Sequence, residues 1–200
     1  KEENDLARLT LQCILVKHEE ITCVVPGLTT VYEVDNAARA SYLREMAISP
    51  AEREWLEQAT ALSPNFAHGL YSRGWAEIMA GDGTAALEHV SRAVDLSPID
   101  PFLYAMLSAK GLAYLHTGEF DQAADWAEQG ARKPGAHFLI KAISAAACHI
   151  AGQNDRASYW RDQSLAARPD ASATMFFSAF PFQDEETRGK LYDALLRLGY

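Results

Sequence analysis

The sequence is poor in cysteine and in basic residues, and it has no long hydrophobic run. Three cysteines in 200 residues are too few for a disulfide framework and fit a reducing compartment, so we expect a cytoplasmic protein. Lysine and arginine number 18 against 27 acidic residues, giving a net charge of −9. Nucleic acids and anionic membranes bind basic surfaces, so neither is expected as a partner. The apolar runs are far shorter than the roughly 20 residues that span a bilayer.

Motifs for catalysis and for metal binding are also missing. There is no phosphate-binding loop, no Gly-x-Gly-x-x-Gly and no Ser-His-Asp constellation. Cys13, His18 and Cys23 lack the closely spaced cysteine pairs of zinc sites. Cys148 and His149 are adjacent, and neighbours on a helix do not face each other. We therefore expect no enzymatic activity, no metal and no bound cofactor.

What the sequence does contain is a repeat. Its prolines at 64, 98, 134 and 169 are 34, 36 and 35 residues apart. A glycine lies between each pair, at 81, 118 and 152, and an alanine follows five residues after each glycine. A period in the mid-thirties is typical of stacked helix–turn–helix units.

The repeat predicts three helical hairpins and a final helix. Their helices are expected at 66–80 and 84–96, at 102–116 and 120–131, and at 137–151 and 156–168. Asn65 and Asp100 are suited to cap the first helix of units one and two. Asp184 is suited to cap a last helix at 185–198, whose apolar face is expected to cover the end of the stack.

Each unit places a small residue at one position of each helix, where two backbones would approach closely. The six residues are Gly74 with Ala86, Gly111 with Ala123, and Ala145 with Ala157. With the prolines that follow, they resemble the tetratricopeptide repeat over residues 60–170. Glu77, Cys148 and Arg161 depart from that family's pattern. The resemblance implies an all-α superhelix whose concave face binds a protein or peptide.

The ending of the chain resembles the tail of bacterial regulators. The similar residues are Pro181, Phe182 and Asp184, followed by the leucines and Gly199. In those regulators a tetratricopeptide region follows an adenylate cyclase or winged-helix domain. The chain also starts without methionine, so we expect a piece of a longer signalling protein.

Residues 1–58 do not share the period and predict a small α/β appendage to the repeat domain at 59–200. A helix, a strand at 21–25, a Pro-Gly pair and a second helix resemble the C-terminal segment of aldo-keto reductases. The resemblance implies that Gly27, Thr29 and Asn36 hold the 2′-phosphate of NADPH. That family's catalytic residues lie on strands without a counterpart here. A reductase fragment or fusion, and a homodimer paired through the strand, stay open as alternatives.

In the tetratricopeptide family the first helix of each unit lines the concave groove. Mapped onto this chain, the groove has Tyr71 and Trp75 as aromatic anchors. They stand where some members clamp a peptide carboxylate, so binding of chaperone tails is not expected. The histidines raise the hypothesis that affinity changes near pH 6. The predicted groove residues are His68, Tyr71, Trp75, Met79, Ser108, Leu112, Leu115, His116, Leu139 and His149.

Overall fold

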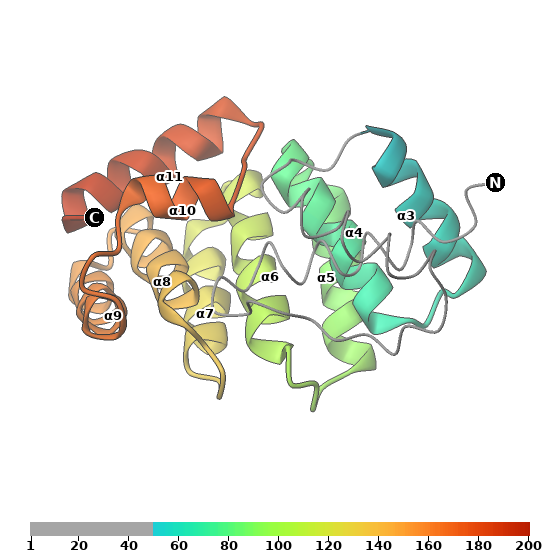
Figure 1. Ribbon diagram of the computed structural model, residues 1–200, viewed down its shortest axis with the longest axis horizontal. Helices are drawn as coiled ribbons and strands as arrows, with labels where there is room; N and C mark the ends of the chain where they lie inside the picture. The colour runs from blue at the N-terminus through green and yellow to red at the C-terminus, as the bar shows by residue number, and fades with distance from the viewer. Residues whose placement is uncertain (1–49) are drawn as a thin grey trace, which may run out of the picture.

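The computed structural model describes residues 50–200, and this part is all-α (Figure 1). Nine helices and no strand are found within it. The prediction of an all-α fold is confirmed, while residues 1–49 of the appendage predicted at 1–58 lie outside the described residues. The helices are α3 (Pro50–Leu62), α4 (Ala67–Ala80), α5 (Gly83–Leu96), α6 (Leu103–Thr117), α7 (Phe120–Ala131), α8 (Phe138–Ile150), α9 (Asn154–Ala167), α10 (Ala173–Ala179) and α11 (Glu185–Leu198).

Three consecutive helical hairpins form the body of the molecule: α4 with α5, α6 with α7, and α8 with α9. In each hairpin a glycine with positive φ lies one or two residues after the first helix, at 94° for Gly81, 80° for Gly118 and 74° for Gly152. A residue with a Cβ is strained there, so the recurring glycines have a conformational cause. Within the described residues, the sequence pattern located all three turns.

The recurring small residues lie where the two helices of a hairpin touch. A Cβ added to Gly111 would lie 2.8 Å from the backbone nitrogen of Ala127 and 2.9 Å from the carbonyl oxygen of Ala123. At Gly74 it would meet Val90 at 2.5 Å and the carbonyl oxygen of Ala86 at 3.3 Å. The predicted close approach of the backbones is confirmed in the first two hairpins.

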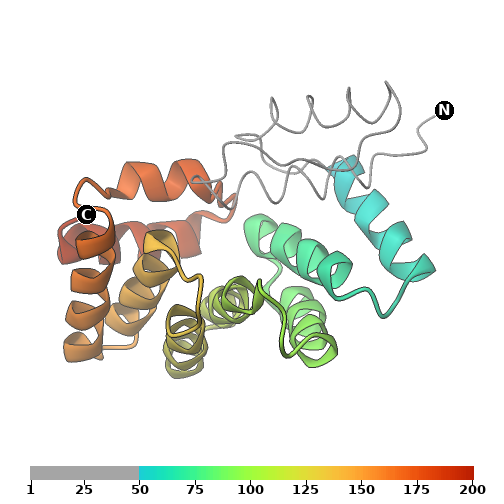
Figure 2. The same ribbon diagram turned by 60° about the horizontal axis from the view of Figure 1, so that its bottom comes forward.

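The stack is curved, and the first helices form its inner side. α4 packs on α6, and α6 packs on α8, in addition to the contacts within hairpins. Figure 2 shows α4 on the same side of the stack as α10 and α11, with α5 and α7 on the opposite side. We call the surface formed by α4, α6 and α8 the inner face. Ten of the 15 residues of α6 and ten of the 13 residues of α8 are buried, because these helices have neighbours on several sides.

The C-terminal helix α11 packs where the expected cap would lie. It contacts α8 and, to a smaller extent, α9, which are the two helices of the last hairpin. Its start is as predicted, because the Asp184 carboxylate accepts a hydrogen bond of 2.8 Å from the Thr187 N–H. α11 therefore begins at the predicted residue and covers the last hairpin.

Two helix starts differ from the sequence prediction. Phe66, not Asn65, precedes α4, and the Asn65 side chain instead accepts a hydrogen bond from Arg92 of α5. α6 begins at Leu103, and Asp100 binds the Phe102 N–H in the turn before it. Helix α3 runs across residue 58, where the sequence placed the domain boundary.

Candidate binding site

The ten predicted groove residues all lie on the inner helices α4, α6 and α8, but most of them are buried. Leu112, Leu115 and Leu139 are 0–2% exposed, and Tyr71, Trp75 and Met79 are 4–5% exposed. His68 and His149 are partly buried, and the His116 side chain is almost fully buried. The inner face is thus a packed surface rather than an open groove, and its cover includes the chain's own C-terminal segment.

We call residues 173–187 the docked segment, since its second half, residues 180–187, contacts α4 and α6 of the inner face. The Phe180 ring meets the Trp75 ring edge-to-face with centroids 5.3 Å apart. Beside it, the Gln183 backbone N–H donates a 2.7 Å hydrogen bond to the carbonyl oxygen of Met79. Phe180 is 2% exposed and Phe182 is 5% exposed, so both rings are removed from water. A segment of this chain with two buried aromatic side chains therefore occupies the site that the sequence analysis predicted for a partner peptide.

His116 joins the end of α6 to the start of α11. Its side chain is 2% exposed, and its Nδ1 lies 2.9 Å from Thr187 Oγ1 and 3.6 Å from an oxygen of Asp184. The Phe182 ring lies 6.1 Å away. Burial lowers the pKa of His116, although Asp184 and the Ile78 carbonyl oppose this shift. The histidine is therefore held neutral in the packed state, as a hydrogen-bonding partner of Thr187.

Two predicted residues face other parts of the chain. Ser108 lies against α7, where a Cβ on Gly130 would run into its hydroxyl oxygen, and it donates a 2.9 Å bond to the Tyr104 carbonyl. His68 pairs with Asp100 at 3.3 Å and meets the Phe102 ring edge-on at 5.5 Å. Ser108 thus closes a hairpin, and His68 connects α4 to the turn before α6.

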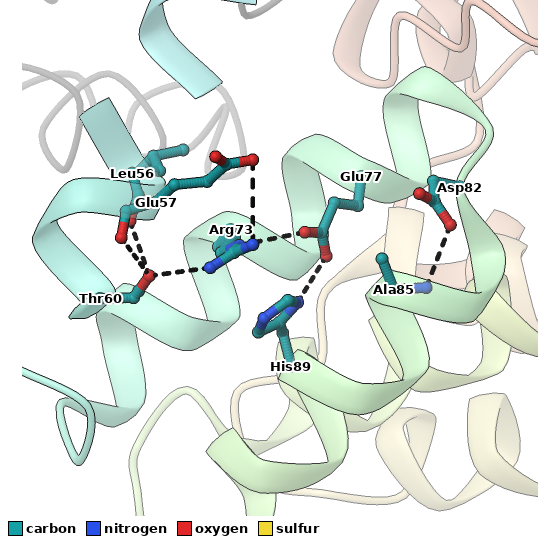
Figure 3. A network of polar contacts seen from close by, with 8 residues as sticks. All are labelled: Leu56, Glu57, Thr60, Arg73, Glu77, Asp82, Ala85 and His89. Carbon is teal, nitrogen blue, oxygen red and sulfur yellow. Dashed lines mark hydrogen bonds and ion pairs between the residues drawn. The ribbon is translucent and has the colours of Figure 1, made fainter. Parts of the chain in front are cut away.

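A polar cluster that the sequence analysis missed lies between α3, α4 and α5 (Figure 3). Arg73 donates to Glu77 at 3.1 Å and to Thr60 at 3.2 Å, and it lies 3.8 Å from Glu57. The other oxygen of Glu77 is 2.8 Å from Nδ1 of His89. These contacts tie α3 to the first hairpin.

The same cluster borders a cavity of about 250 Å³. Its lining includes four carboxylates and one guanidinium: Glu54, Glu57, Glu77, Asp82 and Arg73. Burial raises the pKa of Glu77, and the hydrogen bonds and charges of His89 and Arg73 oppose that rise. The i, i+4 spacing of Arg73 and Glu77 was the only local signal for this cluster. Because Arg73, Glu77 and His89 already pair with one another, we interpret the cluster as a structural contact between α3 and the first hairpin.

The comparisons with known proteins give no family for this chain. The sequence matches no model of a known protein family, and no curated protein is significantly similar to it. The stack of packed helix pairs is compatible with a helical repeat.

Several predictions lie outside the described residues. These are the NADPH-site residues Gly27, Thr29 and Asn36, the strand at 21–25, and the cysteines at 13 and 23. Among residues 50–200 no group of three or more histidine, cysteine or acidic side chains is placed to hold a metal ion. In the same stretch, every helix is too short or too polar to cross a membrane.

Proposed function

We propose that this chain is a tetratricopeptide-like interaction module that binds a protein or peptide through its inner face and performs no catalysis. One observation carries the proposal. The inner face already holds a stretch of peptide, the docked segment, through an aromatic contact at Trp75 and a backbone hydrogen bond at Met79. Aromatic anchors combined with backbone bonding are a usual way for proteins to recognise peptides.

The proposal extends to the setting of the module. The resemblance of the chain's ending to bacterial regulators supports a role as the sensory or scaffolding tail of a cytoplasmic signalling protein. In that role, binding of a partner to the inner face would change the activity of an effector domain.

The test compares three baits made as the whole 200-residue chain. They are the wild-type chain, Trp75→Ala at the inner face, and the aromatic control Tyr159→Ala, which alters a 54% exposed side chain on α9. Thermal unfolding checks that each bait is folded, and Trp75→Phe serves as a second variant that retains a ring. Proteins captured from a bacterial lysate are then purified and titrated against each bait by calorimetry.

We expect to find a partner that binds the wild-type chain and Tyr159→Ala saturably. The same partner should bind Trp75→Ala at least tenfold more weakly, because anchor aromatics carry much of the binding energy. A partner that binds all three baits equally would place the interaction elsewhere. If no captured protein binds any folded bait saturably, the proposal fails.

A further inference from the structure

We propose that the inner face recognises a partner segment with the chemistry of the docked segment, and that residues 173–187 are an intramolecular competitor which the partner displaces. The chemistry is two aromatic side chains two residues apart, followed by an acidic residue that caps a helix. This inference rests on the proposed function and specifies its partner.

The contacts of the docked segment are those of a bound peptide. Between α10 and α11 the chain is not helical, and the Gln183 N–H bonds across to Met79 rather than within the segment. Phe180 and Phe182 supply the rings that meet Trp75 and His116 at centroid distances of 5.3 and 6.1 Å. None of these contacts depends on the covalent link to α9, so a separate peptide can repeat each of them.

The far end of the docked segment explains the requirement for an acidic cap. Asp184 accepts the Thr187 N–H and starts α11, and the Thr187 hydroxyl reaches His116. Asp184 packs closely on the turn of the first hairpin, since a Cβ added to Gly81 would lie 2.8 Å from the Cβ of Asp184. An Asp-x-x-Thr sequence after the aromatics therefore matches two features of the surface, a glycine turn and a buried histidine.

Competition determines how the system responds to mutation. A segment tethered to its own site is present at a high effective concentration, so a free peptide binds only the fraction of molecules whose segment is open. Weakening the docked segment raises that fraction and strengthens peptide binding. In a chain whose own Phe180 ring is removed, weakening the inner face at Trp75 acts mainly on the free peptide and lowers its binding. The two kinds of variant must move the affinity in opposite directions, which a simple loss of folding does not produce.

The probe is a fluorescent peptide with the sequence of residues 173–187, titrated into the full chain and followed by anisotropy. In the chain, Phe180→Ala removes a buried ring and is expected to tighten peptide binding about tenfold or more. Thr187→Val removes only the hydroxyl bound to His116, and we expect about fivefold tighter binding. Thr187→Ser keeps the hydroxyl and should bind the peptide more weakly than Thr187→Val.

Two controls test the site itself. Trp75→Ala, combined with Phe180→Ala in the chain, is expected to bind the peptide at least tenfold more weakly than Phe180→Ala alone, because only the free peptide still has the ring that meets Trp75. A peptide carrying Phe180→Ala should lose affinity to a similar degree. Tyr159→Ala in the chain, on the outer surface of α9, provides the matched aromatic substitution.

Three results would overturn the inference. One is the absence of saturable peptide binding to any loosened variant. Another is equal or weaker binding to Phe180→Ala and Thr187→Val than to the wild-type chain. The third is a loosened variant that dimerises in light scattering without peptide, since the occupant would then be a second copy of the chain. A captured partner that binds at Trp75 while the peptide fails would leave the proposed function standing and remove this inference alone.

Discussion

Two glycines in helices provide a sharp test of the packing in the hairpins. Gly111 in α6 and Gly189 in α11 are both inside helices, but only one faces a backbone. A Cβ on Gly111 would lie 2.8 to 3.0 Å from three atoms of α7, two of them backbone atoms. A Cβ on Gly189 would have no atom within 4 Å. Replacing each by alanine therefore changes the same local preference in two different environments.

The expected magnitudes follow from two opposing effects. Alanine is favoured over glycine inside a helix by about 0.8–1.0 kcal/mol, so Gly189→Ala should stabilise the protein by roughly that amount. Gly111→Ala has the same gain but forces α6 and α7 apart, and overpacking of this kind costs about 1–3 kcal/mol. The helix preference cancels in the difference between the variants, which isolates the cost of separating the helices.

The assay is thermal unfolding followed by circular dichroism at 222 nm. For a protein of this size, 1 kcal/mol shifts Tm by about 2–4 °C. Gly189→Ala should raise Tm by about 2–4 °C, and Gly111→Ala should melt about 2–12 °C below Gly189→Ala. An equal rise in Tm for both variants would refute the close contact between α6 and α7.

Three further predictions concern ionisable groups. Burial raises the pKa of Cys148 to about 11, so in a chain whose other cysteines are serine, iodoacetamide at pH 8 should label it only after unfolding. Burial acts to raise the pKa of Glu128, but hydrogen bonds from Arg156 and Trp160 outweigh burial and lower it. The contribution of Glu128 to the free energy of unfolding is therefore complete above pH 4.5, the usual pKa, and is lost as the pH falls below that value. Glu128→Gln should remove that part of the acid dependence in urea unfolding. Burial lowers the pKa of His116, so the contribution of this residue to the free energy of unfolding is complete above pH 6.5, the usual pKa, and is lost as the pH falls below that value. The stability of the wild-type chain should therefore drop on acidification more steeply than that of His116→Gln.

The hairpins could be predicted because their signals are local. A glycine at each turn and a small residue five positions later are fixed by φ and by backbone contact within one unit, as Gly81 and Ala86 illustrate. The helix starts were less predictable. Asn65 is a residue type that caps helices, but its side chain accepts a hydrogen bond from Arg92 of another helix instead.

The occupant of the inner face could not be predicted, because it depends on contacts between distant parts of the chain. Phe180 and Trp75 each read as apolar residues, and no local pattern pairs them. Ser108 shows the same limitation on a smaller scale. The repeat alignment placed it on the inner face, whereas Gly130 of α7 leaves a space that the Ser108 hydroxyl fills. Sequence periodicity thus located the helices of the inner face but not what lies against them.

The backbone bond between Gln183 and Met79 has a consequence for how the stack comes apart. In a linear repeat array each unit touches only its neighbours, so the ends fray and melting spreads inward. Here Gln183 returns to the first hairpin, and α11 lies on the third. The stack is thereby closed into a ring of contacts in which neither terminal hairpin is a free end. Opening the first hairpin requires releasing the last element, so the described part of the chain should unfold in one cooperative transition rather than unit by unit.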